Sequence, residues 1–293
     1  MINYIDTKSD LGFKKVFGEK PHLLISLLNN LLPLPYPIVN VQYLSPEIIP
    51  DLHEGKNSIV DVRCTDNHGR HFIVEMQVGR QSGYLKRALM NTTKVYSRQL
   101  MKDAQFLSSQ PVYSLNLLDH LFKPDHADWY HHYAMTNRND MDEFIDDLQI
   151  IMIELPKWRK IGKFDLNNPK DRWLMYFTEP HAFDRLTKEE RAKYDEIYEA
   201  LESVEAKNFS PERLYAYELY IDNIRQYVTT MESERQEGRK EGRVEGKEEG
   251  INEGLSISLQ IIDALKHNQE SPEEIALRFN APLDLVIRLK SMI

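Results

Sequence analysis

Two acidic positions on consecutive short apolar segments are the residues of this chain best suited to chemistry. They are Asp61 and Glu75, and Gln77 follows Glu75 at a spacing of two. Segments 59–65 and 71–78 alternate with period two and are rich in β-branched residues, which predicts two strands. Asn67 and Gly69 lie between the segments and indicate a hairpin turn.

The pairing of these strands decides whether the two carboxylates meet. If the hairpin is symmetric about His68, Asp61 lies opposite Glu75. Directly opposed residues have Cβ atoms about 4.5–5.5 Å apart, so the two carboxylates would repel each other. A divalent cation with oxygen ligands is one way to neutralise them. The alternation predicts one apolar face and one polar face, made respectively of Val60, Val62, Cys64, Phe72, Val74, Met76 and Val78, and of Asp61, Arg63, Glu75 and Gln77.

An Asp on one strand and Glu-x-Gln on the next resembles the active site of PD-(D/E)xK nucleases, with Gln in place of Lys. More narrowly, the chain resembles the Rpn family of recombination-promoting nucleases, which are also described as PD-(D/E)xK transposases. The resemblance covers about the first 120 residues well and the later helical part less specifically. It is carried by Asp10-Leu11-Gly12-Phe13-Lys14-Lys15-Val16-Phe17-Gly18, Lys56, Asp61, Gly69, Glu75-Met76-Gln77 and segment 87–96.

The resemblance implies a magnesium-dependent DNA endonuclease associated with recombination or mobile elements. Asp61, Glu75 and the carbonyl of Met76 would hold Mg²⁺, for which Ca²⁺ or Mn²⁺ could substitute. Gln77 can orient a water molecule, but it cannot act as a base or carry charge. Asp10 matches an acidic position of the family and reaches the metal, or it serves only as a helix N-cap.

The charge distribution favours DNA as the partner despite a net charge of −9. Residues 1–110 carry 13 basic and 10 acidic side chains, and segment 78–102 has six basic and no acidic ones. The apolar spacing in segment 81–105 predicts a helix whose core face consists of Leu85, Leu89, Thr92, Tyr96 and Leu100. Arg87, Lys94 and Arg98 form a basic stripe that contacts the DNA backbone or is merely solvated. Lys56 contacts phosphate or lies in a solvated loop.

The order of predicted elements indicates an α/β fold with a restriction-endonuclease-like core, a mixed sheet flanked by helices. A helix capped by Ser9 or Asp10 precedes a strand at 38–44, the hairpin, the helix at 81–105, and strands at 111–118, 129–135 and 148–155. Helices follow from 171 to 231, with a capping box at Thr187. The expected divisions are a nuclease domain (1–165), a helical extension (166–235), a Glu-Gly helix or linker (236–254) and a helical appendage (255–293).

The Glu-Gly tract repeats five times with a period of four, from Gly238 to Gly254. Each Gly costs about 1 kcal/mol relative to Ala inside a helix, so this helix would be marginal alone. Packing of another helix on the glycine stripe would restore order. We therefore expect the tract and the helical appendage to form a homo-oligomer or to regulate the nuclease.

Several features limit where and how the chain works. No stretch approaches the ~20 apolar residues of a membrane span, and the first residues lack the features of a signal peptide. Cys64 is the only cysteine, which excludes an internal disulfide and fits a cytoplasmic location. Gln77 and the acidic helical half leave an alternative function open. The chain could be a weak or inactive nuclease fold that binds DNA or protein.

Overall fold

The computed structural model describes residues 3–48, 58–99, 108–267 and 270–293. Lys56 lies outside the described residues. The chain divides into two compact units, Met1–Ile221 and Asp222–Ile293. None of the described helices combines the length and the apolar composition that a membrane crossing needs.

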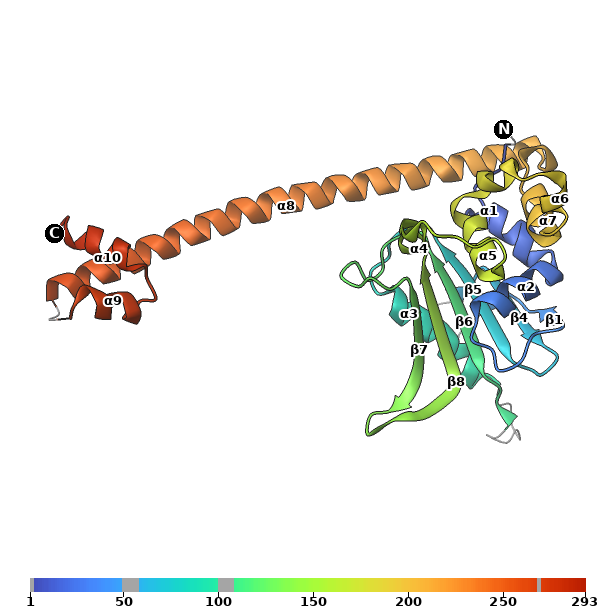
Figure 1. The fold of residues 1–293 in the computed structure, drawn as a ribbon, viewed down its shortest axis with the longest axis horizontal. Helices are drawn as coiled ribbons and strands as arrows, with labels where there is room; N and C mark the ends of the chain where they lie inside the picture. Colours follow the sequence, from blue (N-terminus) through green and yellow to red (C-terminus); the bar gives the residue numbers. More distant parts are fainter. Residues whose placement is uncertain (1–2, 49–57, 100–107, 268–269) are drawn as a thin grey trace. The chain divides into compact units, whose positions relative to one another are not determined.

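A six-stranded mixed sheet organises the first unit (Figure 1). Its spatial order is β1-β4-β5-β6-β8-β7, and β6 pairs in parallel with both β5 and β8 while the other pairs are antiparallel. The α/β fold with a mixed sheet is thus confirmed. The strands are β1 (Val41–Tyr43), β4 (Val62–Asp66), β5 (His71–Gln77), β6 (Val112–Leu118), β7 (Tyr130–Asn137) and β8 (Asp140–Glu154), and β2 (Glu47–Ile48) pairs separately with β3 (Ser58–Ile59).

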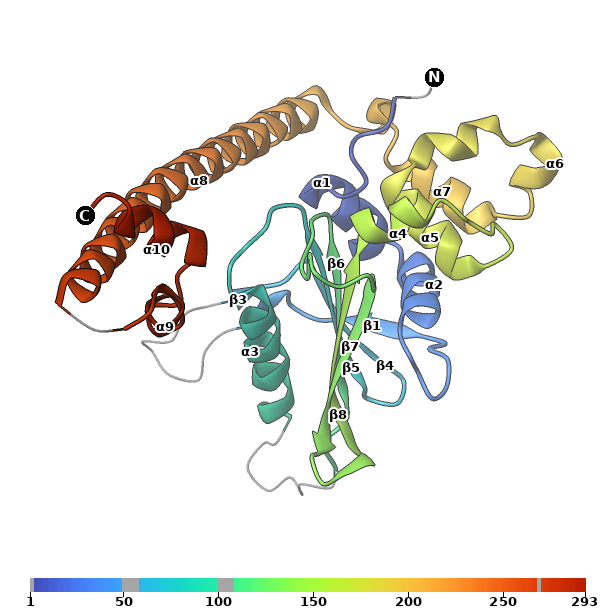
Figure 2. The ribbon, with the colours of Figure 1, turned by 60° about the vertical axis from the view of Figure 1, so that its left-hand side comes forward.

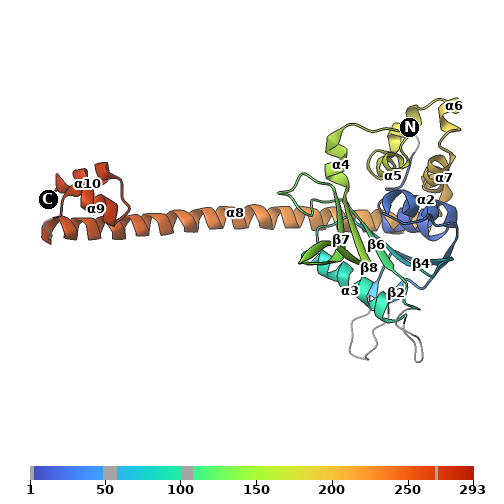
Figure 3. The same ribbon diagram turned by 60° about the horizontal axis from the view of Figure 1, so that its bottom comes forward.

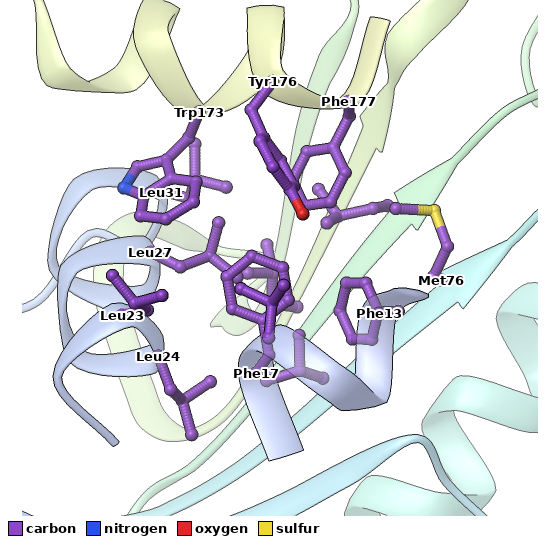
Figure 4. Close-up of a cluster of buried hydrophobic side chains, with 14 of the residues drawn as sticks. Phe13, Phe17, Leu23, Leu24, Leu27, Leu31, Met76, Trp173, Tyr176 and Phe177 are labelled. Carbon is purple, nitrogen blue, oxygen red and sulfur yellow. The ribbon is translucent and has the colours of Figure 1, made fainter. Parts of the chain in front are cut away.

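One face of the sheet is covered by helices from both ends of this unit (Figure 2). Phe13 and Phe17 lie between the leucines of α2 and the aromatic residues of α5, Trp173, Tyr176 and Phe177 (Figure 4). Ser9 caps the first helix by accepting a hydrogen bond from Gly12 N, as predicted. The covering elements are α1 (Asp10–Phe13), the π-helical turn η1 (Lys14–Gly18), α2 (Pro21–Leu31), α4 (Leu155–Ile161), α5 (Pro169–Thr178) and α7 (Asp195–Ser203).

The opposite face of the sheet is covered by α3 (Tyr84–Ser97). The predicted core face of this helix is confirmed at Thr92, which is buried, and wrong at Leu89, which is 47% exposed. Leu85 and Tyr96 are partly buried, and Leu100 lies outside the described residues. The other buried positions are Tyr84, Ala88, Asn91 and Val95. The sheet beneath α3 carries polar groups, which the helix must satisfy. Tyr84 donates a hydrogen bond to Asn116 on β6, and Asn91 donates one to the Glu75 carboxylate on β5.

The β4–β5 hairpin has the predicted register, with Val62 opposite Val74 and Thr65 opposite His71. The predicted apolar face is wrong at Val60, which packs with Ile73 and Val95 on the α3 side of the sheet. The chain bends at Asp61 before β4 begins, and the bend interrupts the alternation. At the turn, Gly69 adopts φ +80°, a conformation that glycine accommodates without strain.

A buried ion pair fixes this turn. Asp66 accepts hydrogen bonds from the backbone of His68 and Arg70 and from Arg70 Nε at 2.8 Å. The Arg70 side chain is 1% exposed and stacks over Tyr36. Every charge at this end of the hairpin therefore has a close partner.

A second buried cluster closes the far end of β8. Glu154 accepts hydrogen bonds from His131, Lys157 and the backbone N–H of Phe122. Burial alone would raise the pKa of Glu154, but these donors outweigh it and lower the pKa. The network holds the segment between β6 and β7, which starts at Asp119.

Helix α8 (Pro211–His267) begins in the first unit, and its part from Asp222 onward, which includes the Glu-Gly tract, belongs to the second unit. Apart from the backbone of α8 itself and the neighbouring residues, no described atom lies within 4 Å of a Cβ built on any of the tract's five glycines. In the second unit, α9 (Pro272–Arg278) and α10 (Leu283–Lys290) pack on the end of α8 around Ile261, Ile275 and Val286 (Figure 3). The remaining short elements are η3 (Pro180–Arg185), α6 (Lys188–Arg191), which has the predicted Thr187 capping box, and η4 (Ala206–Asn208).

Candidate active site

Asp61 occupies the bend that leads into β4. Its Oδ2 accepts a hydrogen bond of 2.7 Å from the backbone N–H of Met76 on β5. Burial raises the pKa of the Asp61 carboxyl, and the nearby charge of Asp10 raises it further, although the Met76 hydrogen bond opposes both effects. The fold therefore holds this carboxylate in place while making its negative charge unfavourable.

Glu75 lies near the end of β5 and is 4% exposed. Its carboxylate accepts hydrogen bonds from Arg87 Nη2 and Asn91 Nδ2 on α3, both long at 3.3 Å. Burial first, and then the charge of Asp61, raise the pKa of Glu75 to about 7. These two long contacts leave the Glu75 charge poorly compensated at neutral pH.

The register brings the two carboxylates close together. The pairing of β4 with β5 ends at Val62 opposite Val74, and one further step along this register places Asp61 across from Glu75. Each carboxylate is surrounded by different groups. The Glu75 side chain contacts α3, whereas Asp61 lines a cavity on the α1 side.

The cavity beside Asp61 has a volume of about 500 Å³. It gathers four of the sequence-predicted site residues, Asp10, Asp61, Met76 and Gln77. Asp10 forms an ion pair of 2.6 Å with Lys14 and is half exposed. The Gln77 amide contacts the Met76 carbonyl at 3.4 Å.

The rest of the cavity wall comes from residues to which the sequence analysis assigns no role in the site. Lys8 and Leu11 lie near the amino terminus, and Arg213, Ala216, Tyr217 and Tyr220 belong to the first turns of α8. Burial raises the pKa of Tyr220, as do the charges of Asp10 and Asp61. These α8 residues are spaced like any helix face and belong to no motif. Their sequence therefore gives no sign that α8 packs beside the hairpin that carries Asp61 and Glu75.

The donor set fits a hard divalent cation with few protein ligands. No three His, Cys, Asp or Glu side chains converge on a metal position within the described residues. Mg²⁺ usually keeps several waters and takes one or two carboxylates plus substrate phosphate. Asp61 and Glu75, whose pKa values are both raised, supply carboxylates that a cation would stabilise.

The basic residues of α3 do not form one exposed stripe. Arg87 pairs with Glu75 and stacks on the Tyr84 ring, so it belongs to the site itself. Lys94 contacts Ser58 Oγ at 3.4 Å, and the charge of Arg98 helps to lower the pKa of Arg63. Lys94 and Arg98 therefore lie beside β3 and β4, on the face of the sheet that α3 covers.

Comparison with known proteins agrees with this arrangement. A family model described as PD-(D/E)XK nuclease family transposase matches residues 7–232, which include both carboxylates and the cavity-lining turns of α8. Neither the curated proteins nor the solved structures gave a match. The family match covers more than half of the chain and includes the whole mixed sheet and both carboxylates. The chain therefore belongs to the PD-(D/E)XK nuclease family of transposases.

Proposed function

We propose that this protein is a metal-dependent DNA endonuclease that hydrolyses phosphodiester bonds during recombination or mobile-element activity. The observation that carries the proposal is the pair Asp61 and Glu75 at the open end of one hairpin. Both have a raised carboxyl pKa, with burial as the largest cause, and the charge of Asp61 contributes to the shift of Glu75. Buried acidic pairs with perturbed pKa values are typical of catalytic sites.

The surrounding residues have roles that fit this reaction. A bound Mg²⁺, or Mn²⁺ in its place, would activate a water molecule and neutralise charge on the phosphate. Asp61, Glu75 and the Met76 carbonyl are the proposed ligands. Asp10 lines the same cavity as Asp61 and Met76, whereas the Glu75 side chain contacts α3. Gln77 would orient the attacking water. Lys8 and Arg213 line the cavity and would offset the charge of the substrate phosphate.

Plasmid nicking by the full chain tests the proposal. We expect Mg²⁺-dependent cleavage of supercoiled DNA, which EDTA abolishes. Asp61→Asn and Glu75→Gln should each lower the rate about 1000-fold, since metal assistance contributes several kcal/mol and each ~1.4 kcal/mol is tenfold. Thr187→Ala, a change to a surface helix cap far along the chain, is the matched control and should cut normally.

A different outcome would favour the second candidate function. The Gln77 side chain cannot serve as a base, and Arg87 and Asn91 already bind the Glu75 carboxylate. DNA binding without cleavage, unchanged by Asp61→Asn, would show a nuclease fold that acts as a binding module. Cleavage at wild-type rates by either carboxylate variant would sink the metal-site assignment.

We also propose that the carboxyl-terminal part of α8 associates with a second copy of the chain. The five glycines leave open space on the helix, and Val244, Ile251 and Leu255 are all more than half exposed. Ending the chain after Met231 should leave a folded nuclease with fewer protomers by light scattering. Equal protomer numbers for both chains would refute this role.

The remaining proposals concern DNA contacts, domain boundaries and location. Lys94 and Arg98 remain proposed contacts to the DNA backbone, and their replacement should weaken the salt dependence of binding. The four expected domain divisions remain predictions, which limited proteolysis can test. A cytoplasmic location is proposed from Cys64, whose buried thiol has its pKa raised to about 12, and cell fractionation can test it.

A further inference from the structure

A second cavity adjoins the catalytic one and has a different charge. Its volume is about 430 Å³, within the range of ligand sites. Its polar lining is mainly cationic: Lys8, Arg159 and Lys160 against the single carboxylate of Asp119. The catalytic cavity, by contrast, contains the carboxylates of both Asp10 and Asp61.

Lys8 lines both cavities, so the two share a wall. Its Nζ forms an ion pair of 3.0 Å with Asp119 Oδ2, and the backbone N–H of Asp119 donates to the carbonyl of Gln77 at 2.8 Å. The residue after β6 therefore ties Lys8 to the end of β5, which bears the catalytic motif. This arrangement places the second cavity directly beside Gln77, at the carboxyl ends of the parallel strands.

The other two cations are available to a ligand. Arg159 is 61% exposed and makes one ion pair, with Glu179, that also lies largely in solvent. Lys160 is exposed, and no ion pair to it occurs in the part of the chain that the structure describes. Both lie in the last turn of α4, where positive charge is also favourable to the helix dipole. The helix dipole explains why these two residues are positively charged. It does not explain why they line a cavity together with Lys8.

We infer that this second cavity binds a backbone phosphate of the same nucleic-acid strand whose scissile bond lies in the catalytic cavity. The inference rests on the proposed nuclease function and adds to it the direction in which the bound strand leaves the cavity beside Asp61. The strand would pass Lys8 and run over the carboxyl ends of β5, β6 and β8 toward α4. Lys8 would contact the nucleic-acid backbone between the two phosphates. Its ion pair with Asp119 would be replaced by this contact.

The test measures DNA affinity against salt concentration for Arg159→Ala/Lys160→Ala. The background is the full chain with Asp61→Asn, so that the probe, a short fluorescein-labelled DNA duplex, is not cut. Each lost phosphate contact reduces the slope of log K against log salt by about 0.9 for duplex DNA. We expect the double variant to reduce the slope by about 1–2. The control Lys188→Ala/Lys193→Ala removes the same charge from exposed positions around α6 and should leave the slope unchanged.

A second readout does not depend on substitutions. Amine labelling followed by mass spectrometry should show that the DNA probe protects Lys8 and Lys160, whereas Lys188 and Lys193 stay reactive. DNA binding with an unchanged slope and no protection of Lys160 would overturn the inference and leave the nuclease proposal standing. If the wild-type chain neither binds nor cuts DNA, both proposals are wrong.

Discussion

The two ends of the β4–β5 hairpin hold carboxylates in opposite ways. At the turn, Asp66 and Arg70 are 0% and 1% exposed and their side chains meet at 2.7 Å. At the open end, Glu75 meets Arg87 at 3.3 Å, and the arginine is 38% exposed. A close buried pair with satisfied backbone donors fixes a turn. A loose pair beside a second carboxylate leaves charge uncompensated, so the two ends of one hairpin differ in how well their carboxylates are neutralised.

The largest expected effect follows from breaking the turn end. Asp66→Ala would leave Arg70 buried without its partner, which costs about 3–5 kcal/mol of unfolding free energy. Urea denaturation measures this change. Asp66→Ala/Arg70→Leu, which removes both charges, should recover part of the loss. A single variant as stable as the wild-type chain would show that the pair does not fix the turn.

A smaller effect of opposite sign is expected at the open end, where removal of the carboxylate charge should increase the free energy of unfolding. The folded chain raises the pKa of Glu75 from an ordinary 4.5 to about 7, so the folded state binds more protons than the unfolded state between these values. The contribution of Glu75 to stability is therefore fully present below about pH 4.5 and is lost as the pH rises through about 7. Glu75→Gln stays neutral and should gain on the wild-type chain by the order of 1–3 kcal/mol across this window.

Urea denaturation of both chains without divalent cations, at about pH 5 and about pH 7.5, measures this difference. Arg87→Gln sharpens it, because the arginine charge lowers the pKa of Glu75 and its removal should move the window to higher pH. Added Mg²⁺ should stabilise the wild-type chain more than Glu75→Gln at the higher pH. A constant stability difference across the window would mean that Glu75 is an ordinary, solvated carboxylate.

Local patterns were sufficient to predict the β4–β5 hairpin, its turn and its register. Alternation and Gly69 specify this hairpin, and the Ser9 and Thr187 caps follow from side-chain chemistry that acts within four residues. Prediction of the paired carboxylates rested on the register and on the family resemblance together. The proposed site residues Asp10, Asp61, Met76 and Gln77 line one cavity.

The features that sequence reasoning missed depend on contacts between distant segments. The acidic start of β8, Asp140–Asp147, lacks alternation, and it forms a strand because β7 pairs with it as a hairpin. The α3 core face was predicted correctly at Thr92 but missed Tyr84 and Asn91, which are buried because they donate hydrogen bonds to the polar groups Asn116 and Glu75 of the sheet. Arg213 and Tyr220 reach the cavity only through tertiary folding, so no local pattern could reveal them.

The route of the chain around the cavity beside Asp61 also determines when that cavity can exist during synthesis. The backbone N–H of Asp6 donates to Tyr217 Oη at 2.9 Å, and the N–H of Ile5 donates to the carbonyl of Val204. The amino-terminal segment that carries Lys8 and Asp10 thus has partners about two hundred positions downstream. A ribosome exposes Asp10, Asp61 and Glu75 early, yet the cavity wall is incomplete until Tyr220 has emerged. The nascent chain therefore carries every motif residue well before it has an enclosed site in which to use them.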